Sequence, residues 1–322
     1  MGVRELNLDF SQGVSSPVAH FVLPQAFRQH LGNQFLRVSS PYEDFTKFFG
    51  EMASLRIQLP TGLLSILGEF RSQANFTGIL LLRNMPIDSV LPESPVDGKH
   101  SPLKTTFVSE SSLGVTASCL GSIFGYRFEK EGALIHNISP VKAKQKSLSN
   151  EGSEADFLFH TEVAFSKDRP DYLMLLGLRQ GPYPLVPTRV ARAVDALDLL
   201  SKSDIKALSE SRFQLFAPES FAKSETTGPV AVLGGDVDSP RLRLNLNHML
   251  ATDSRAEVAL SHLAEALEQT EYQISLEPGD LLILDNHKVV HGRLPFHAAF
   301  NGQDRWLQRA YLRETSHAYD QF

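Results

Sequence analysis

The second half of the chain contains a series of short strand-like segments separated by turn residues, and this series constrains the fold most. Tyr172–Leu178 is apolar throughout, and polar and apolar residues alternate strictly in Arg241–Asn247. Alternation with a period of two is typical of a strand with one face in the core. Helical patterns are concentrated in the first third and in the middle. This arrangement predicts an α+β protein with a double-stranded β-helix (jelly-roll) core and helical additions.

The remaining elements follow from apolar spacing, helix caps and turn residues. Strands are expected at Phe76–Arg83, Phe213–Phe216, Val230–Leu233 and Arg305–Leu312, and on either side of Pro278-Gly279 within Gln273–Asp285. Helices are expected after Pro60, at Ser112–Phe124, at Val190–Leu208 with a break near Ser201–Asp204, and from a capping box formed by Ser254 and Glu257. We expect one domain over 1–322, with helix and strand additions in about 1–130 and the jelly-roll core, with a helical insert, in about 131–322.

Composition excludes several classes of protein. The net charge is −6 and no block of Lys or Arg is present, which argues against a nucleic-acid partner. The single cysteine, Cys119, cannot form an intramolecular disulfide. No secretory signal and no apolar run near the ~18 residues of a membrane span is visible. We therefore expect a soluble, cytoplasmic protein with no membrane partner.

A candidate metal site begins with His160-Thr-Glu162. Chance alone gives roughly one His-x-Asp/Glu sequence in a chain with 11 His and 37 acidic residues, so this pair is a weak signal by itself. On a strand, however, side chains two residues apart face the same way. An imidazole and a carboxylate suit iron(II), and a second His would complete a facial triad that leaves open coordination positions.

The second His is expected near the end of a later strand, where two candidates occur. His287 and His291 both follow the apolar strand that ends at Asp285. They are four residues apart, so on one strand they would share a face, and spacing does not choose between them.

Two arginines follow this segment and indicate an anion site. Arg305 and Arg309 are four residues apart on a predicted strand and flank Trp306 and Leu307. A partly buried guanidinium needs an anionic partner, and its planar fork can bind a carboxylate through two parallel bonds. A 2-oxoacid that chelates iron would place such a carboxylate here.

Together these segments resemble a known family. Phe159–Phe165, Asp285–Arg293 and Asp304–Arg309 occur in the same order in the clavaminate synthase-like branch of the iron(II)/2-oxoglutarate oxygenases. This branch includes bacterial hydroxylases of free arginine, asparagine and related amino acids. The resemblance covers at least Phe76–Arg313 and implies that the single domain is an oxygenase.

The resemblance implies a role for each of the candidate residues. His160, Glu162 and His291 match the iron ligands, Arg309 matches the main 2-oxoglutarate anchor with Arg305 assisting, and Thr188 matches a threonine that also contacts 2-oxoglutarate. The implied reaction uses O₂ to convert 2-oxoglutarate to succinate and CO₂ while a substrate C–H bond is hydroxylated. A carboxylate ligand, Glu162, favours hydroxylation or desaturation over halogenation.

The expected substrate is a free amino acid, bound through its ammonium by Glu162 and its carboxylate by Arg309. As we align them, the related arginine hydroxylases carry an Asp-x-Asp pair where this chain has Asn245-Leu-Asn247. Amides cannot neutralise a guanidinium, but they offer donors and acceptors to a neutral amide or urea. We therefore expect citrulline, glutamine or asparagine, in specialised metabolite or antibiotic biosynthesis. His136 is a further candidate for the pocket lining.

Three alternatives remain open at this point. The substrate could be arginine or lysine, or a residue tethered to a carrier or embedded in a peptide. A metal-free jelly-roll binding module is a different class, and it leaves the arginine pair unexplained. Separately, the polar segment from Lys142 to Glu154 leads directly to His160 and could form a mobile lid.

Overall fold

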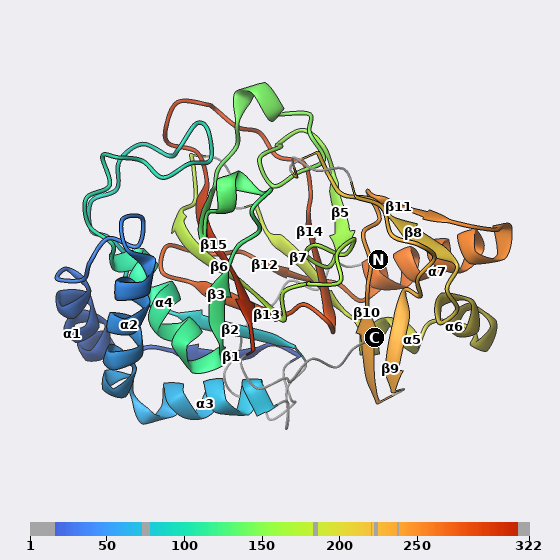
Figure 1. The fold of residues 1–322 in the computed structure, drawn as a ribbon, viewed down its shortest axis with the longest axis horizontal. Helices are drawn as coiled ribbons and strands as arrows, with labels where there is room; N and C mark the ends of the chain where they lie inside the picture. Colours follow the sequence, from blue (N-terminus) through green and yellow to red (C-terminus); the bar gives the residue numbers. More distant parts are fainter. Residues whose placement is uncertain are drawn as a thin grey trace.

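The computed structural model describes residues 17–72, 78–182, 186–219, 221, 225–236 and 238–314. Its strands are β1 (Ala19–Val22), β2 (Ile79–Arg83), β3 (Ser122–Phe124), β4 (Ile135–Ile138), β5 (Phe157–His160), β6 (Tyr172–Arg179), β7 (Thr188–Arg192), β8 (Phe213–Leu215), β9 (Leu233–Asp236), β10 (Ser239–Leu242), β11 (Met249–Ala251), β12 (Tyr272–Ile274), β13 (Leu281–Asp285), β14 (Val289–Arg293) and β15 (Trp306–Arg313). Its α-helices are α1 (Gln25–Phe35), α2 (Phe45–Leu55), α3 (Thr61–Ser72), α4 (Val108–Leu120), α5 (Ala193–Leu197), α6 (Lys202–Leu208) and α7 (Ser254–Gln269). Figure 1 shows α1–α4 on one side of the strands and α5–α7 on the other.

The larger sheet has seven strands in the order β1-β2-β13-β6-β15-β3, with β4 also paired to β15. Its two faces are buried in different cores. Leu80, Met174 and Ile283 pack with residues of α1–α4, whereas Leu81 and Leu175 pack with residues of the smaller sheet. Because successive side chains of a strand point to opposite faces, a strand covered on both sides is apolar throughout. This explains why β2, β6 and β13 lack polar alternation.

The smaller sheet has four strands in the order β12-β7-β14-β5. In this sheet His291 of β14 lies directly opposite His160 of β5. Across the core, Arg309 and Tyr311 of β15 hydrogen-bond to Glu162, which follows β5. The predicted metal ligands therefore lie between the two sheets, among side chains from both.

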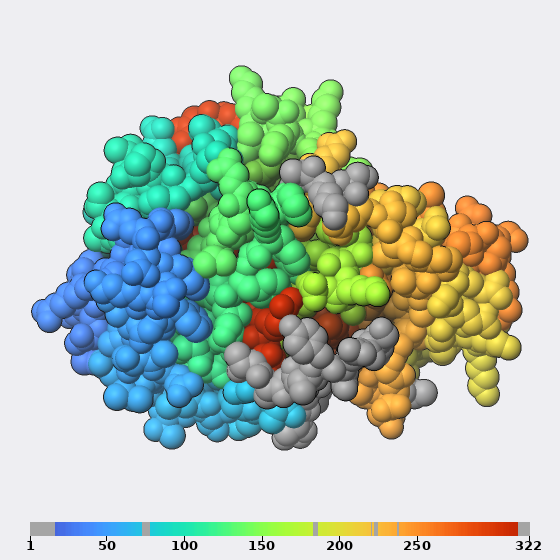
Figure 2. Space-filling model, viewed as in Figure 1, coloured from blue at the N-terminus to red at the C-terminus, as the bar shows by residue number. Residues whose placement is uncertain are grey.

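The C-terminal half contributes a second group of helices beside the smaller sheet. Helix α7 contacts both α5 and α6. In the space-filling view, the residues between about 200 and 270 gather at the opposite end of the molecule from the N-terminal helices (Figure 2). None of the helices in the described part of the chain combines the length and apolarity that a bilayer crossing needs.

Two expected helices differ from those observed. The predicted helix Val190–Leu208 begins instead as strand β7, because residues 188–192 pair with β12 on one side and β14 on the other. The predicted helix Ser112–Phe124 begins earlier, at Val108, and ends at Leu120, before strand β3. Gly121 lies at this junction, where a Cβ atom would collide with the Arg313 carbonyl group.

Other boundaries also shift. The expected strand Arg241–Asn247 ends at Leu242, and Asn245 instead forms an isolated bridge to His160. Helix α7 is capped by Asp253, whose Oδ1 accepts a hydrogen bond from the Ala256 N–H at 3.0 Å. The expected strand Phe76–Arg83 is observed from Ile79 onward, and its first two residues lie outside the described residues.

A buried ionic cluster joins the N-terminal helices to β15. Lys104 Nζ lies 2.8 Å from Asp88 Oδ2 and 2.6 Å from Glu110 Oε2, and all three side chains are buried. Glu110 also accepts a hydrogen bond from Gln308 Nε2 at 2.8 Å. Gln308 and Arg309 are adjacent on β15 and face opposite sides of the sheet. The cluster therefore fixes the strand that carries Arg309 to the site.

Replacing the cation of this cluster should strongly destabilise the fold. We expect Lys104→Met to lower the free energy of unfolding by about 3–5 kcal/mol, because it leaves Asp88 and Glu110 buried without a cation. Denaturant unfolding at neutral pH measures this change. Lys99→Met is a matched control at an exposed ion pair with Glu131 and should leave stability nearly unchanged. Equal effects of the two substitutions would contradict the assigned role of the cluster.

Candidate functional site

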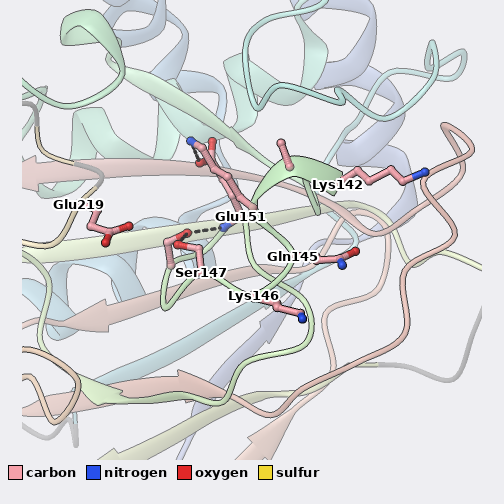
Figure 3. Close-up of a pocket in the computed structure, with 9 residues that line it drawn as sticks. Lys142, Gln145, Lys146, Ser147, Glu151 and Glu219 are labelled. Atoms are coloured by element: carbon pink, nitrogen blue, oxygen red, sulfur yellow. Dashed lines mark hydrogen bonds and ion pairs between the residues drawn. The ribbon is translucent and has the colours of Figure 1, made fainter.

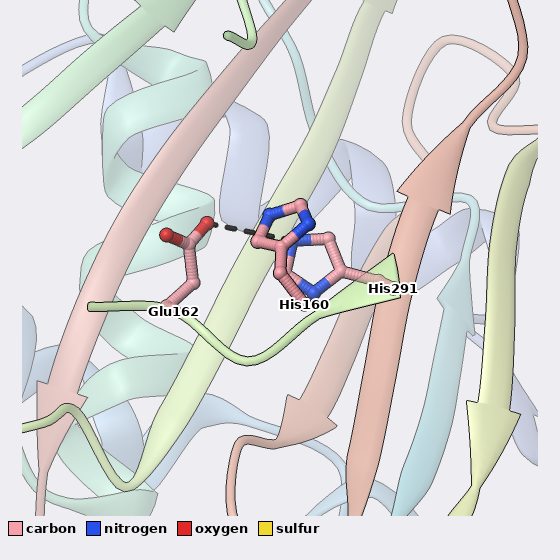
Figure 4. A group of neighbouring side chains, drawn as sticks. All are labelled: His160, Glu162 and His291. Atoms are coloured by element: carbon pink, nitrogen blue, oxygen red, sulfur yellow. Dashed lines mark ion pairs between the residues drawn. The ribbon is translucent and has the colours of Figure 1, made fainter. Parts of the chain in front are cut away.

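Three predicted ligands converge between the sheets. His160, Glu162 and His291 each offer a ligand atom, and these atoms all lie within 4.8 Å of one another. His291 Nε2 is 3.4 Å from Glu162 Oε1, and the two imidazole rings have centroids 4.2 Å apart. Figure 4 shows the Glu162 carboxylate directed toward the two rings. Two neighbouring strands and the turn after one of them therefore supply the whole set.

The local environment keeps His160 neutral and orients it for a metal. Burial, followed by the neighbouring His291, lowers the pKa of His160 to about 3. Its Nδ1 lies 2.8 Å from the Leu158 carbonyl oxygen, which can only accept a hydrogen bond. The proton therefore sits on Nδ1, and Nε2 is left with a lone pair. This is the usual arrangement of a metal-bound histidine, whose other ring nitrogen donates to a carbonyl or a carboxylate.

Glu162 lies just beyond the end of β5, so strand geometry alone does not place it. The Asn286 side chain holds its backbone: Oδ1 accepts from the Glu162 N–H at 2.6 Å and Nδ2 donates to the Glu162 carbonyl at 3.1 Å. The next residue, Val163, has a φ of 53°, in the left-handed region that a β-branched residue rarely adopts. Strain of this kind is common where a site fixes a side chain.

A buried network of charges surrounds Glu162. Arg309 Nη1 donates to Glu162 Oε1 at 3.1 Å, and the Tyr311 hydroxyl donates to Oε2 at 3.1 Å. Burial works to raise the pKa of Glu162, but Arg309 and His291 outweigh it and hold that pKa below its ordinary range. Arg309 also donates to Glu129 Oε1 at 2.6 Å. Arg309 is thus already paired with two carboxylates.

Arg305 lies in a different electrostatic setting. It lines a cavity together with Glu162, Thr188, His291, Arg293 and Arg309, here called the Arg305 cavity. Its Nη2 donates to the Thr188 hydroxyl at 3.5 Å, and it forms no ion pair within the described residues. Burial lowers its pKa to about 10, so the guanidinium remains charged at neutral pH.

Arg293 adds a second cation to the same cavity. Burial, followed by the neighbouring Arg305, lowers the pKa of Arg293 to about 9. Its Nη1 donates to the Gly152 carbonyl at 2.8 Å, whereas its buried Nε and Nη2 have no hydrogen-bond partner among the described residues. Arg293 is buried and Arg305 is half-buried, and two such neighbouring cations without a bonded carboxylate favour an anionic ligand.

A second cavity, here called the Tyr311 cavity, also adjoins the ligand set, and it shares Asn150, Phe157, Glu162 and Arg309 with the Arg305 cavity. Its walls are formed by Glu129, Leu148, Ser149, Asn150, Phe157, His160, Glu162, Val163, Phe165, Pro218, Phe221, Asn245, His248, Arg309 and Tyr311. Of the predicted asparagine pair, only Asn245 belongs to this lining. Asn247 instead accepts a hydrogen bond from the Leu158 N–H at 2.9 Å and supports β5.

Two other predicted residues lie outside both cavities. His136 contacts Arg309 from behind, because its Nδ1 accepts from Arg309 Nη2 at 2.6 Å and its Nε2 donates to the Ala133 carbonyl at 2.8 Å. His287 lies in the turn before β14 and contacts Asp171 Oδ1 at 3.0 Å. Because of this turn, His287 lies outside the ligand set. The geometry therefore favours His291 as the second histidine ligand.

No pattern in the sequence indicates Glu129 as a site residue. Glu129 is buried, lines the Tyr311 cavity and has one oxygen, Oε2, with no hydrogen-bond partner among the described residues. Burial raises its pKa, against the opposing effect of Arg309. Its partner on β15 is 180 residues away, so no local pattern could reveal the pair.

The segment from Lys142 to Glu154 forms an ordered turn beside the site. The Ser153 N–H donates to the Gln145 carbonyl at 2.9 Å, and Glu151 pairs with Lys130 at 2.8 Å. An open pocket on its outer side is lined by this segment and by Glu219 from a separate part of the chain (Figure 3). Leu148, Ser149 and Asn150 also line the Tyr311 cavity. The segment covers the site, and its movement as a lid stays a prediction.

The donor set fits iron(II). It contains a carboxylate held in its ionised form and two imidazoles, the set typical of non-heme iron oxygenases. A model of the family described as "Taurine catabolism dioxygenase TauD, TfdA family" matches residues 42–311. The chain belongs to this family. It is a 2-oxoglutarate-dependent dioxygenase that uses Fe(II) and hydroxylates C–H bonds.

The curated relatives cover most of the chain. The L-asparagine oxygenase of Streptomyces coelicolor is 37% identical over 256 residues, which cover 79% of this chain and 76% of the relative. The enduracididine beta-hydroxylase of Streptomyces hygroscopicus is 33% identical over 294 residues, covering 82% and 84%. Clavaminate synthase 2 of Streptomyces clavuligerus is 32% identical over 279 residues, covering 85% of each. The resemblance to the clavaminate synthase-like branch is therefore confirmed.

Solved structures agree with these matches. Asparagine oxygenase in complex with Fe(II), 3-hydroxyasparagine and succinate has a TM-score of 0.85 and 31% identity, covering 91% of this chain and 93% of that one. The non-heme iron oxygenase OrfP in complex with Fe, succinate and (3S)-hydroxy-L-Arg has a TM-score of 0.81 and 28% identity, covering 92% and 94%. The first structure contains a hydroxylated asparagine and the second a hydroxylated arginine, so similarity alone does not choose a substrate.

Proposed function

We propose that this dioxygenase hydroxylates a free amino acid with a neutral polar side chain, with citrulline, glutamine and asparagine as the preferred candidates. His160, Glu162 and His291 would hold the iron. When bound, the iron supplies the oxidising chemistry that couples decarboxylation of 2-oxoglutarate to C–H hydroxylation. The observation that carries the proposal is that the metal-ligand set lines two adjoining cavities, one of which contains Arg293 and Arg305 and the other Glu129.

The Arg305 cavity suits the distal carboxylate of 2-oxoglutarate. Arg305 and Arg293 are charged there without a bonded carboxylate, and Thr188 supplies a hydroxyl group. Arg309 is less suitable as the main anchor because Glu162 and Glu129 are paired with it, and the distal carboxylate of 2-oxoglutarate brings no cation to compensate these two carboxylates. We therefore assign the main 2-oxoglutarate contact to Arg305, with Arg293 and Thr188 assisting. This order reverses the one expected from the sequence.

The Tyr311 cavity suits the head group of an amino acid. Arg309 can bind the α-carboxylate, because its Nε has no hydrogen-bond partner among the described residues. Glu129 Oε2, which also lacks a partner there, can accept from the α-ammonium together with Glu162. A cation and two carboxylates at one end of a cavity complement the zwitterion of a free amino acid.

The remaining lining of this cavity supports a neutral side chain. Glu129 and Glu162 are the carboxylates of its described lining, and both are bonded to Arg309. Ser149, Asn150, Asn245 and His248 are uncharged polar residues of the same lining. A guanidinium or ammonium side chain would lie there without a carboxylate partner, at a cost of about 1–3 kcal/mol or more. Arginine and lysine remain the second candidates, because OrfP binds a hydroxylated arginine.

Two further expectations remain part of the proposal. We infer that the two facing sheets form the double-stranded β-helix expected from the sequence, and that 1–322 act as a single oxygenase domain. A free substrate is preferred to a carrier-tethered one, because the described groups of the Tyr311 cavity can satisfy both the ammonium and the carboxylate. A role in specialised metabolite biosynthesis is supported by the enduracididine and clavaminate relatives.

A screen of free amino acids tests this function. The enzyme, supplied with Fe(II), 2-oxoglutarate and ascorbate, should release succinate and form a product one oxygen atom heavier with at least one of citrulline, glutamine and asparagine. Turnover with arginine and lysine should be at least about tenfold lower, in line with one unpaired buried charge. Strong turnover of arginine with none of the three neutral substrates would refute the preference. Absence of turnover with every amino acid would refute the proposed class of substrate.

A further inference from the structure

His136 and Arg309 face each other on neighbouring strands. They lie directly opposite in the register of β4 and β15, and side chains at opposite positions project from the same face of a sheet. The ring of Tyr311, two residues farther along β15, lies edge-on to the His136 ring with centroids 5.5 Å apart. His136 is buried, yet it is not among the described residues that line either cavity. Its hydrogen-bonded contact with the site therefore runs through Arg309.

The partners of the two ring nitrogens fix the state of His136. Nε2 lies 2.8 Å from the Ala133 carbonyl oxygen, which can only accept, so Nε2 carries a hydrogen. Nδ1 lies 2.6 Å from Arg309 Nη2, which can only donate, so Nδ1 carries the lone pair. A ring with one hydrogen on nitrogen is neutral. Burial, followed by the charge of Arg309, lowers the pKa of His136, in agreement with this state.

The missing charge matters because Arg309 also contacts two carboxylates. Its Nη1 donates to Glu162, and its Nη2 donates to Glu129 as well as to His136, which uses both hydrogens of Nη2. Glu129 Oε1 lies 3.9 Å from His136 Nδ1, too far for a hydrogen bond, so the two acceptors contact the guanidinium separately. A third carboxylate in place of His136 would repel the α-carboxylate of a substrate. A neutral imidazole holds the guanidinium without this repulsion.

We propose that His136 is a positioning residue for Arg309, which it orients toward the α-carboxylate of the amino acid by accepting a hydrogen bond from Nη2. The inference rests on the proposed function, in which Arg309 binds that carboxylate. The guanidinium is planar and its donors have fixed directions, so an acceptor on Nη2 also sets the direction of the Nε donor. Nε has no hydrogen-bond partner among the described residues and is left for the substrate.

Substitutions of His136 test this role through a difference between two KM values. His136→Leu removes the acceptor and should raise the KM for the amino acid by about tenfold, in line with one lost hydrogen bond to a charged group. The KM for 2-oxoglutarate should stay unchanged, because the main oxoacid contact, Arg305, has no described hydrogen bond to His136. His136→Gln can supply a carbonyl acceptor to Arg309 and an NH₂ donor to Ala133, and should restore most of the loss.

Two further variants serve as controls. His30→Leu makes the same change at an exposed histidine and should leave both KM values unchanged. Should His136→Leu fail to fold, His136→Asn replaces it with the same expectations, because its shorter side chain cannot reach both partners of the ring. The anaerobic spectrum with Fe(II) and 2-oxoglutarate, measured for each variant, reports whether the iron site is intact.

The methyl ester of the amino acid distinguishes positioning from a general structural role. The ester keeps the ammonium and the side chain but lacks the carboxylate charge. Anaerobic calorimetry in the presence of Fe(II) and 2-oxoglutarate measures the Kd of both compounds. We expect the amino acid to bind about tenfold more weakly to His136→Leu than to the wild type, and the ester to bind equally to both. Equal weakening of amino acid and ester, or of amino acid and 2-oxoglutarate, would overturn the positioning role.

These outcomes are distinct from failure of the proposed function. A wild-type enzyme that turns over no amino acid contradicts the proposed function. Amino acid turnover by the wild type with an unchanged KM in His136→Leu contradicts only the role of His136. The choice between neutral and basic side chains does not enter, because every free amino acid carries the α-carboxylate.

Discussion

The His291→Ala variant is expected to lose iron binding and turnover together. His291 lies opposite His160 across two neighbouring strands, and its Nε2 is 3.4 Å from Glu162 Oε1. Removing one of three protein ligands leaves the imidazole and the carboxylate without the third corner of the triad. Anaerobic addition of Fe(II) and 2-oxoglutarate should give a weak visible charge-transfer band in the wild type and none in the variant. Metal analysis after gel filtration should show the same loss of iron.

His287→Ala is the matched control for this experiment. His287 lies four residues before His291 and has the same ring, but it contacts Asp171 outside the ligand set. The variant should keep both the band and the bound iron. An unchanged band in His291→Ala with a lost band in His287→Ala would contradict the ligand assignment.

Arg305→Leu should produce the second large effect, a rise in the KM for 2-oxoglutarate of about 30-fold or more. Truncating one partner of a buried charged hydrogen bond costs about 2–5 kcal/mol, and each 1.4 kcal/mol corresponds to about tenfold. Arg305 forms no ion pair within the described residues. Removing its side chain should therefore mainly weaken the binding of 2-oxoglutarate. Titration of the charge-transfer band with 2-oxoglutarate measures the corresponding rise in Kd.

The Arg309→Leu variant distinguishes the role of Arg309 from that of Arg305. Arg309 bonds to Glu162 and Glu129, so its removal should raise the KM for the amino acid more than the KM for 2-oxoglutarate. The order expected from the sequence, with Arg309 as the main oxoacid anchor, predicts the opposite pattern. A larger effect of Arg309→Leu than of Arg305→Leu on 2-oxoglutarate binding would restore that order.

Local patterns predicted those parts of the fold that local interactions decide. The apolar runs of β6 and β13 and the Pro278-Gly279 turn were visible because burial on both faces and turn geometry leave a direct trace in residue type. Strand β7 was missed because its partners, β12 and β14, are distant in sequence, and tertiary pairing overrode a helical pattern.

In the site, too, the sequence predicts residues that are close together in the chain but not the pairings between distant segments. His160 and Glu162 are close in sequence, and the spacing of Arg305 and Arg309 places both on one face of β15. The choice between the arginines was not accessible, because it depends on Glu129, which pairs with Arg309 from 180 residues away. Likewise, Asn245 and Asn247 have the same spacing as two residues on one strand face. The irregular backbone after Leu242 separates them, so only Asn245 belongs to the cavity lining.

Isotope labelling tests the central claim most directly, namely that this triad couples 2-oxoglutarate decarboxylation to hydroxylation of a free amino acid. The reaction is run under ¹⁸O₂ in unlabelled water with the best substrate of the screen. Mass spectrometry then measures the masses of succinate and of the amino acid product. We predict one ¹⁸O atom in succinate and one in the hydroxylated amino acid, with equal amounts of the two products. Succinate formed without a labelled amino acid product, or an amino acid product that carries oxygen only from water, would contradict the claim.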